Sequence, residues 1–407
     1  MSNNTQPEIR FPGFTEDWEE RKLNELAEFN PKSDLPERFE YVDLESVVGT
    51  ELVGHRTENR YSAPSRAQRL AKKNDVFYQT VRPYQKNNYL FDLPYDNYVF
   101  STGYAQMRPI GNGYFLLTLI QEEKFVNRVL ERSTGTSYPA INSNDLAKLP
   151  VKVPADIQEQ QKVGTFFKQI YNTITLHQRK LDLLKETKKG FLQKMFPKNG
   201  AKVPEIRFPG FTEDWEQRKL SEMAGFSKGN GYSKADLVEK GHPVILYGRL
   251  YTKYETVIEK VDTFAELKEK SVISNGGEVI VPASGETPED ISRASVVDVS
   301  GVALGGDLNI IKTKSELDPT FLALTISNGS QQKEMTKRAQ GKSVVHLHNS
   351  DLKEVNLLYP KLDEQVKIGS FFKKLDVAIT LHQRKLDLLK ETKKASYKRC
   401  LSRREEE

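Results

Sequence analysis

A loop that follows an apolar segment carries side chains suited to reading nucleic-acid bases. Within Gln79–Asn88, amide, guanidinium and aromatic groups follow one another closely. An arginine can donate two hydrogen bonds to guanine in the major groove, and glutamine or asparagine can pair in the same way with adenine. We therefore predict that this loop contacts DNA, although a solvated loop is the alternative for any single residue. The candidates are Gln79, Thr80, Arg82, Tyr84 and Lys86.

Two glycine loops in distant parts of the chain share the pattern Arg-x-x-Gly-x-Ser. One begins at Arg132 and the other at Arg338. Backbone amides and hydroxyl groups in such loops can hold phosphates and fix the register of a protein on DNA. These loops are stronger candidates than any single side chain, because the chain presents the same loop twice. Their residues are Gly135, Thr136 and Ser137 in the first loop, and Gln340, Gly341, Lys342 and Ser343 in the second.

Further loop candidates lie in the second half of the chain. The segments Tyr247–Lys253 and Ser284–Thr287 again combine aromatic, charged and hydroxyl groups beside apolar runs. Solvated loop surface is again the alternative to a direct base contact. The residues predicted to contact DNA are Tyr247, Arg249, Tyr251, Lys253, Ser284, Gly285 and Glu286.

Motifs for catalysis or metal binding are weak. Gly341-Lys342-Ser343 resembles the end of a phosphate-binding loop, but Thr336 stands where that loop requires glycine. His346 and His348 offer two ligands on one face of a strand, yet no acidic cluster accompanies them, so a surface strand is the preferred interpretation. The methyltransferase motifs Asn-Pro-Pro-Tyr and Asp-Pro-Pro-Tyr are absent, as is the Asp…Glu-x-Lys spacing of a common nuclease type. We predict a non-catalytic chain with no metal site and no bound cofactor.

The composition permits a nucleic-acid partner without requiring one. The 407 residues include 61 Lys and Arg against 56 Asp and Glu, which gives a net charge of +5. Cys400 is the only cysteine, so a disulfide within the chain is excluded. The first residues lack a secretory pattern and no run of 18 apolar residues occurs, so we expect a cytoplasmic protein without a membrane span.

Two strings of the sequence occur twice. Residues 7–23 and 204–220 differ at a single position, and residues 380–394 repeat the string TLHQRKLDLLKETKK of residues 175–189 unchanged. The stretches between these strings match poorly. We infer a repeated scaffold that carries two different inserts.

The segments around the second string have the heptad pattern of a coiled coil. Apolar residues recur at spacings of three and four over about four heptads in each copy. We expect two helices, each roughly 60 Å long, that pair in an antiparallel manner. The predicted seam consists of Val163, Phe167, Ile170, Ile174, His177, Leu181 and Leu184, and of Ile368, Phe372, Leu375, Ile379, His382, Leu386 and Leu389.

Polar residues interrupt this seam at equivalent positions. We interpret His177 and His382 as polar residues that fix register, with a metal or acid–base role as the alternative. Lys188 and Lys393 are expected to extend their amines past the seam into water.

The two inserts are predicted to share one α+β fold with different surfaces. Each ends with a helix, expected at Tyr114–Glu131 and at Pro319–Arg338, followed by the glycine loop, a strand and a proline. Strands are predicted at Asp75–Thr80, Asn97–Phe100, Gln106–Ile110, Leu149–Val153, Pro243–Tyr247, Glu278–Val281, Ser295–Val299, Asn309–Lys312 and Val355–Tyr359. The predicted boundaries are 1–26 (first frame segment), 27–154 (first insert), 155–197 (first long helix), 198–223 (second frame segment), 224–360 (second insert), 361–401 (second long helix) and 402–407 (charged tail).

This layout resembles the DNA specificity subunit of type I restriction–modification systems over nearly the whole chain. The resemblance is carried by the frames Pro7–Trp18 and Pro204–Trp215, and by the Glu-Gln segments at Glu159 and Glu364 that open the long helices. The segments Val76–Tyr84 and Gly277–Thr287 are also similar to strand–loop segments of that family's target-recognition domains. The implied fold has two globular target-recognition domains separated by two long antiparallel coiled-coil helices, in a pseudo-two-fold internal repeat.

The resemblance also implies function and partners. Each insert would read one half of a bipartite, asymmetric site in double-stranded DNA, and the helices would fix the spacer. Two copies of the methyltransferase (modification) subunit would dock on the frames and bring S-adenosylmethionine. Translocase–nuclease (restriction) subunits that use ATP and Mg²⁺ would join them. A coiled-coil scaffold for two different proteins, without DNA, is one alternative, and a self-contained restriction enzyme is another.

Overall fold

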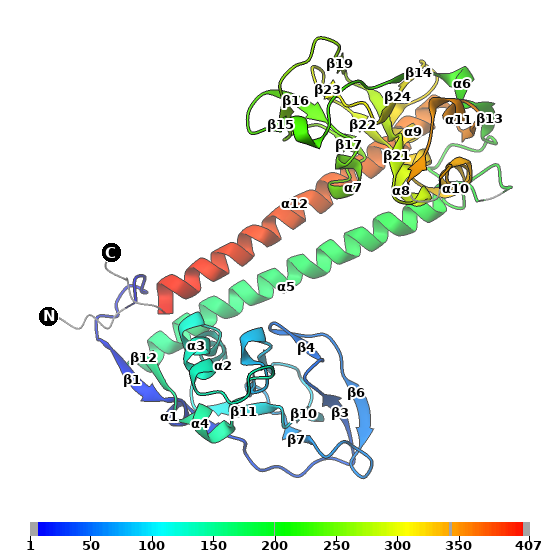
Figure 1. Ribbon diagram of the computed structural model, residues 1–407. Coiled ribbons are helices and arrows are strands. Elements are labelled where there is room, and N and C mark those ends of the chain that lie inside the picture. Colours follow the sequence, from blue (N-terminus) through cyan, green and yellow to red (C-terminus); the bar gives the residue numbers. More distant parts are fainter. Residues whose placement is uncertain (1–6, 199, 342–343, 402–407) are drawn as a thin grey trace. The chain divides into compact units, whose positions relative to one another are not determined.

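The computed structural model describes residues 7–198, 200–341 and 344–401, and the chain divides into two compact units. Unit 1 comprises the chain up to Gln178 together with the part from Lys385 onward, and unit 2 comprises Arg179–Arg384. The long helices α5 (Ile157–Lys194) and α12 (Leu362–Leu401) each contribute one part to each unit (Figure 1). No helix within the described ranges is long and apolar enough to cross a membrane.

The repeated frame folds in the same way in both units. In unit 1, β1 (Trp18–Lys22) pairs antiparallel with β12 (Pro150–Pro154), the strand that precedes α5. In unit 2, β13 (Glu216–Lys219) pairs antiparallel with β26 (Asn356–Tyr359), which precedes α12. Each frame is thereby fixed beside the start of a long helix.

A buried ion pair fastens each frame to the first turn of its long helix. The Nε and Nη2 atoms of Arg10 donate to the two carboxylate oxygens of Glu159, both at 2.7 Å. Arg207 donates in the same manner to Glu364, at 2.7 and 2.8 Å. Both carboxylate side chains are only 1% exposed. Because bidentate pairs also fix orientation, they account for an arginine and a glutamate at equivalent places in both copies.

Two four-stranded sheets form the insert of unit 1, in the orders β6-β3-β10-β7 and β2-β11-β8-β9. Their strands are β2 (Ala27–Phe29), β3 (Arg38–Val42), β6 (Arg56–Asn59), β7 (Ala67–Leu70), β8 (Val76–Gln79), β9 (Tyr89–Leu90), β10 (Tyr98–Ser101) and β11 (Tyr104–Pro109). A small hairpin joins β4 (Val47–Val48) to β5 (Glu51–Leu52). The helices are α1 (Leu23–Leu26), η1 (Pro83–Gln85), α2 (Gly113–Ile120), α3 (Glu123–Glu131) and α4 (Ser143–Ala147).

Two five-stranded sheets form the insert of unit 2, in the orders β14-β24-β20-β22-β17 and β15-β18-β16-β23-β19, and β21 pairs with β25. The strands are β14 (Ala224–Lys228), β15 (Leu237–Val238), β16 (His242–Ile245), β17 (Val257–Ile258), β18 (Phe264–Ala265), β19 (Val272–Ile273), β20 (Glu278–Pro282), β21 (Ser284–Gly285), β22 (Ser295–Val297), β23 (Ala303–Leu304), β24 (Leu308–Thr313) and β25 (Val345–His346). The helices are α6 (Leu220–Met223), η2 (Lys234–Asp236), α7 (Arg249–Thr252), α8 (Pro288–Ile291), α9 (Pro319–Ile326), α10 (Gly329–Arg338) and α11 (Asn349–Lys353).

The nine predicted strands are confirmed, with small shifts at their ends. The prediction of one continuous helix near the end of each insert, at Tyr114–Glu131 and at Pro319–Arg338, is wrong. Each is two helices. Glu122, with φ −66° and ψ 138°, is extended between α2 and α3. Ser327 and the extended Asn328 separate α9 from α10, which begins at Gly329 with φ +73°.

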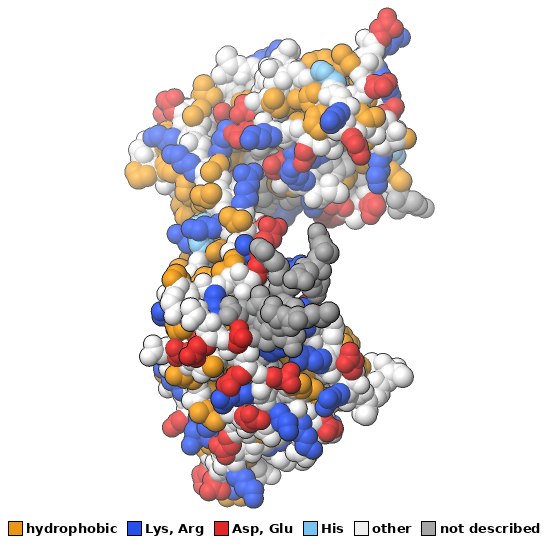
Figure 2. All heavy atoms as spheres, turned by 90° about the vertical axis from the view of Figure 1, so that its left-hand side faces the viewer, with side chains coloured by type: hydrophobic (Ala, Val, Ile, Leu, Met, Phe, Trp, Pro, Cys, Tyr) orange, Lys and Arg blue, Asp and Glu red, His pale blue; other side chains and the backbone are white. Residues whose placement is uncertain are grey.

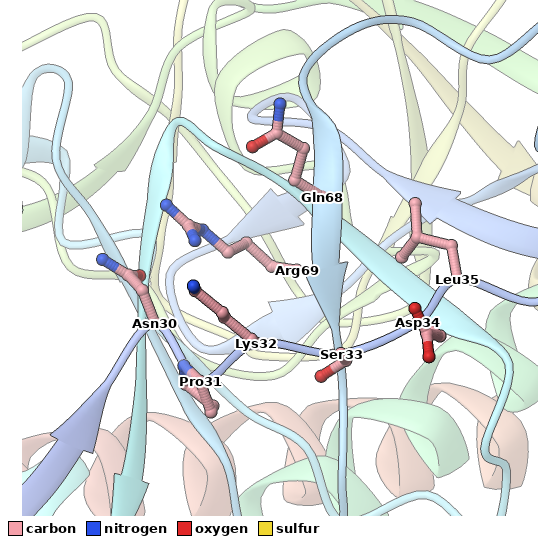
Figure 3. A pocket seen from close by; sticks show the side chains of 8 residues that line it. All are labelled: Asn30, Pro31, Lys32, Ser33, Asp34, Leu35, Gln68 and Arg69. Atoms are coloured by element: carbon pink, nitrogen blue, oxygen red, sulfur yellow. The ribbon is translucent and has the colours of Figure 1, made fainter.

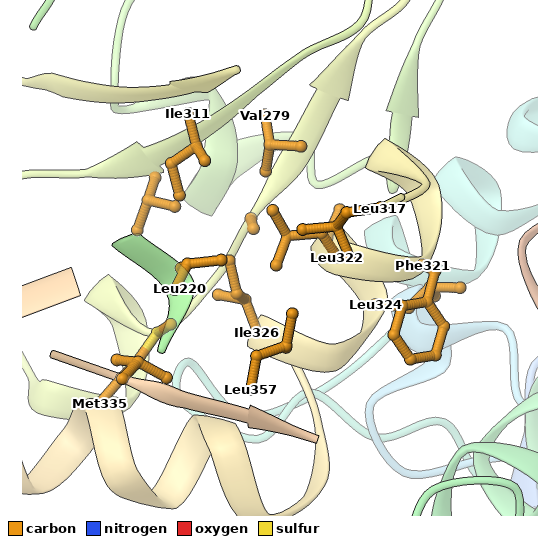
Figure 4. Close-up of a cluster of buried hydrophobic side chains, with 14 of the residues drawn as sticks. Leu220, Val279, Ile311, Leu317, Phe321, Leu322, Leu324, Ile326, Met335 and Leu357 are labelled. Atoms are coloured by element: carbon orange, nitrogen blue, oxygen red, sulfur yellow. The ribbon is translucent and has the colours of Figure 1, made fainter. Parts of the chain in front are cut away.

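Each unit has a hydrophobic core that joins its insert to the long helices. In unit 2 the core includes Leu220, Val279, Phe321 and Leu357 (Figure 4). It also includes Phe372 of α12. In unit 1 the corresponding core includes Trp18 of the frame and Phe167 of α5. The long helices are therefore stabilised by the inserts as well as by each other.

The long helices pair antiparallel within each unit, as predicted. In unit 1, the ring of Phe167 stacks on that of Tyr397 with 4.8 Å between centroids, and Lys393 Nζ lies 3.7 Å from the ring centroid of Tyr171. In unit 2, Phe191 meets Phe371 with 5.0 Å between centroids. Residue numbers on α12 decrease as those of their contact partners on α5 increase, as in an antiparallel pair. The seam residues that are buried are Val163, Phe167, Leu181, Ile368, Phe372 and Leu386, and those that are half-buried are Ile170, Ile174, His177, Leu184, Leu375, Ile379, His382 and Leu389.

The prediction that both seam lysines extend into water is wrong. Lys188 Nζ lies 2.5 Å from Asp376 Oδ1. Its equivalent, Lys393, lies over the ring of Tyr171, close to the hydroxyl pair of Tyr171 and Tyr397. The residue facing the lysine differs between the copies, so two identical strings form an ion pair in one unit and a cation–π contact in the other.

Candidate nucleic-acid interface

The first glycine loop forms a small hairpin that extends the sheet of unit 1. Thr134 and Ala140 exchange backbone hydrogen bonds of 2.8 and 2.9 Å. Beyond the end of β8, Ile141 N donates to Thr80 O at 3.0 Å and Arg82 N donates to Pro139 O at 2.8 Å. The hairpin thus lies directly beside the predicted base-reading loop. Its tip residues Gly135, Thr136 and Ser137 are exposed.

The second glycine loop makes the same arrangement in unit 2. Gln340 and His346 exchange backbone hydrogen bonds of 3.0 and 2.8 Å. Leu347 N donates to Ala283 O at 3.0 Å, and Gly285 pairs with Val345 just beyond the end of β20. The two predicted loops therefore occupy equivalent places in the two inserts. Lys342 and Ser343 lie outside the described residues.

Both hairpins require glycine at the turn. Gly135 has φ +91° and Gly341 has φ +130°, which are left-handed values that other residues rarely adopt. A Cβ atom on Gly341 would stand 2.0 Å from Val344 O, and one on Gly135 would stand 3.0 Å from Tyr138 O. The glycines let the backbone turn tightly where a Cβ atom would crowd a carbonyl oxygen.

The guanidinium of Arg82 is held on an aromatic ring at the edge of the first hairpin. Its Cζ lies 4.6 Å from the ring centroid of Tyr138, whose side chain is 63% exposed. Arg82 itself has φ +55°, so the backbone turns sharply to present this side chain. A stacked guanidinium keeps its donors in a fixed plane, which suits bidentate contact with guanine. The sequence analysis did not predict a role for Tyr138. The only signal in the sequence is its position directly after the Arg-x-x-Gly-x-Ser pattern.

Three other predicted residues of the first loop have internal partners. Gln79 is buried, and its Nε2 donates to Val81 O at 2.7 Å and to Gln85 Oε1 at 2.9 Å. Thr80 is buried and donates to Gly103 O at 2.8 Å. Lys86 Nζ lies 2.5 Å from Glu123 Oε1 at the start of α3. These residues position the loop, whereas Tyr84, which is 49% exposed, lies at its tip.

In unit 2, the structure brings two of the predicted segments together. Tyr251 donates from its hydroxyl to Ser284 O at 2.7 Å, and its ring meets that of Tyr247 with 5.9 Å between centroids. Burial raises the pKa of the Tyr251 hydroxyl, so this group stays protonated and remains a hydrogen-bond donor. The exposed Glu286 follows directly after the hairpin-paired Gly285. Tyr247, Ser284 and Glu286 therefore lie on the same edge as the second hairpin.

The cations of this region are largely neutralised. The side chain of Arg249 is buried and pairs with Asp262 at 2.6 Å and with Glu255 at 2.7 Å. Lys253 also pairs with Asp262 at 2.6 Å, and these contacts hold the pKa of that carboxyl down at about 2. Arg249 therefore holds the loop in place.

On the face shown in Figure 2, Lys and Arg side chains are interspersed with Asp and Glu, without a broad region of one sign.

The histidine pair does not assemble a larger polar cluster. The rings of the exposed His346, at the end of β25, and the exposed His348, just before α11, are stacked with 6.1 Å between centroids. Within residues 7–198, 200–341 and 344–401, no group of three or more His, Cys, Asp or Glu side chains is arranged to hold a metal ion.

Comparison with known proteins assigns the repeated architecture to a family. The family model described as the type I restriction modification DNA specificity domain matches residues 15–186 and, a second time, residues 212–391. The chain belongs to this family. It is a specificity subunit, the component of a restriction–modification system that recognises DNA and is not itself an enzyme.

Curated relatives and solved structures agree with this assignment. The specificity subunit is 21% identical to the type I restriction enzyme MjaVIII specificity subunit of Methanocaldococcus jannaschii, over 80% of this chain and 73% of the relative. It is 26% identical to the HindI specificity subunit of Haemophilus influenzae, over 36% of this chain and 34% of the relative. The crystal structure of a type I S subunit from M. genitalium has the same fold, with a TM-score of 0.66, 12% identity and coverage of 98% and 100%. A chain from a study of assembly and conformational transition in the type I system matches with a TM-score of 0.50, 20% identity and coverage of 97% and 99%.

Proposed function

We propose that this specificity subunit reads a bipartite, asymmetric DNA site, with one half-site read by each insert. The observation that carries the proposal is the pair of equivalent hairpins, at Thr134–Ala140 and Gln340–His346, each beside the end of a central strand. Equivalent hairpins suit equivalent phosphate contacts, which carry no sequence information. The side chains beside them differ, with Arg82 and Tyr138 in one insert and Tyr247 and Glu286 in the other. Different neighbours at equivalent positions suit two different half-sites.

We assign the phosphate contacts to the hairpin tips and the base contacts to the side chains beside them. Gly135, Thr136 and Ser137 would hold the backbone in the first half-site, and Gln340 with Gly341 in the second. The stacked Arg82 is the strongest candidate for a base contact, because its guanidinium is fixed and no carboxylate among the described residues pairs with it. Gln79, Thr80, Arg249 and Lys253 would support these loops through their internal contacts.

The repeated scaffold would dock two copies of one methyltransferase subunit. Exposed leucines recur at equivalent, seven-residue spacings in the repeated strings, at Leu176 and Leu183 on α5 and at Leu381 and Leu388 on α12. Each is more than 60% exposed, and a stripe of leucines at heptad spacing suits packing against another helix. Identical stripes would bind identical partners. S-adenosylmethionine would be bound by these partners, and ATP and Mg²⁺ by the translocase–nuclease subunits.

Mapping the methylated bases in a genome that carries this chain and its methyltransferase tests the proposal. The expected pattern is one motif with two specified parts and a spacer of fixed length. A continuous motif would contradict the two-part assignment. If the complex binds no duplex in a mobility-shift assay and captures two proteins through its inserts, the scaffold alternative would replace the proposal.

A further inference from the structure

A cleft in unit 1 shares no residue with the hairpin and loop described above. The segment Asn30–Leu35 lines one part of it, and Gln68 and Arg69, at β7, line another (Figure 3). Its volume is about 510 Å³, which is within the range of pockets that take small organic ligands. Two of the side chains that line it, Lys32 and Arg69, are cations, and one, Asp34, is a carboxylate.

The guanidinium of Arg69 has no counter-charge in the part of the chain that the structure describes. Its Nε is buried there without a hydrogen-bond partner. Arg69 is half-buried, and this burial lowers the pKa of its guanidinium. A cation withdrawn from water without a partner is unfavourable, so the site favours an incoming anion.

A second cation faces the same part of the cleft. Figure 3 shows the amine of Lys32 and the guanidinium of Arg69 directed to the same side, near Asn30. The carboxylate of Asp34 lies on the other side of the cleft in this view. Two cations without an intervening carboxylate match the charge and the several acceptor oxygens of a phosphate group.

One buried residue holds both sides of the cleft. Gln106 is fully buried, and its backbone N donates to Asn30 Oδ1 at 3.0 Å while its O accepts from Asn30 N at 2.7 Å. Its Nε2 donates to the backbone oxygen of Leu70, the neighbour of Arg69, at 2.8 Å. The cleft is therefore fixed before any ligand arrives, which reduces the entropy cost of binding.

We propose that this cleft binds a phosphodiester group of the DNA backbone through Arg69 and Lys32. This contact would add to those of the hairpin and fix the register of the first insert on its half-site. The inference rests on the proposed function, because DNA supplies the phosphate. A free inorganic phosphate has the same chemistry, so the experiment must separate the two sources.

The salt dependence of DNA binding tests the assignment. With the full chain in its methyltransferase complex, Arg69→Gln should weaken binding to duplex DNA by about tenfold, equally for target and random sequences. Removal of one phosphate contact should also make the negative slope of log K against log salt concentration shallower by about one unit. Lys32→Gln, on an exposed segment, should act in the same direction. Arg66→Gln is the matched control, because Arg66 is exposed nearby and does not line the cleft.

The remaining outcomes separate the possibilities. Equal slopes for wild type and Arg69→Gln would overturn the DNA assignment, and an equal effect of Arg66→Gln would show a general loss of charge without a site. Inorganic phosphate is tested by thermal unfolding at constant ionic strength. If phosphate raises the Tm of the wild type but not of Arg69→Gln, while the DNA slopes are equal, the ligand is a free anion and the DNA contact is refuted. If the wild-type complex binds no duplex at all, the proposed function fails, whatever the phosphate result.

Discussion

A single arginine illustrates how backbone geometry and a neighbouring ring can hold a side chain in place. The left-handed backbone at Arg82 and the exposed ring of Tyr138 fix the guanidinium at the edge of the hairpin. The sequence predicted Arg82 from its residue type, but the ring that orients it comes from a hydrogen-bonded loop more than fifty positions later. Such a partner cannot be inferred without the pairing of the two segments.

Substitution of Arg82 by lysine should relax specificity at one base pair. Lysine keeps the charge but loses the planar, bidentate donor set and the stacking on Tyr138. We expect discrimination at one position of one half-site to fall by about 1–3 kcal/mol, with the other half-site unchanged. Binding measured on duplexes with single base changes checks this. Arg132→Lys, an exposed neighbour, is the control, and equal losses for both variants would refute the assignment of Arg82.

The half-buried Lys393 should make stability depend on pH. Burial lowers its folded-state pKa to about 8, whereas the unfolded value is the ordinary 10.5. Between these values the unfolded chain binds more protons, so stability should rise with pH from about 8 to 10. Tyr171 and Tyr397 have raised pKa values and stay neutral in this window.

Thermal unfolding of Lys393→Met across this pH range measures the effect. The wild-type Tm should rise over this range, and the rise should be absent in the variant. Lys188→Met, the equivalent change in unit 2, should instead lower the Tm at all these pH values, because it leaves Asp376 without its cation. A wild-type Tm that does not rise above pH 8 would contradict the interpretation of Lys393.

At the scale of the element, the elements predicted correctly were those specified by local patterns. The heptads predicted the long helices, and the apolar runs predicted strands such as β8 and β20. Strand β6 reads Arg-Thr-Glu-Asn and was not predicted, because its polar residues lack the apolar alternation of a half-buried strand. It forms through pairing with β3, which is a tertiary effect.

The ion pairs between frames and helices should contribute strongly to stability. Arg207→Met would leave the buried carboxylate of Glu364 without its partner, at a cost of about 3–5 kcal/mol. The double variant Arg207→Met, Glu364→Met should recover most of this loss, because both charges are then removed. Chemical denaturation of the two variants checks the prediction. Equal destabilisation by the single and double variants would show that the pair has no charge-dependent role.

The helix pair should set the spacer. One heptad inserted at equivalent points of residues 175–189 and 380–394 lengthens both partners by about 10 Å, or roughly three base pairs at 3.4 Å each. The methylated motif should gain about three spacer positions while both half-sites stay the same. An unchanged spacer in a folded, active complex would refute the role of the helices as a ruler.

At the scale of the whole molecule, the near-identical strings belong to the repeated frames and long helices, and the unlike stretches form the two inserts. The repeat was evident in the sequence, and the equivalence of the two hairpins was predicted from the glycine loops. The cleft at Arg69 was not predicted, because Asn30 and Arg69 meet only through the buried Gln106 on a third strand. Long-range polar contacts of this kind leave no periodic signal in a sequence.

Exchange of one insert tests the central claim most directly. Residues 27–154 would be replaced by the corresponding insert of another specificity subunit, and the methylated motif of the resulting complex would be mapped. The account predicts that one half-site changes while the other half-site and the spacer remain as in the wild type. A change in both half-sites, or in neither, would contradict the claim that each insert reads its own half of the DNA site.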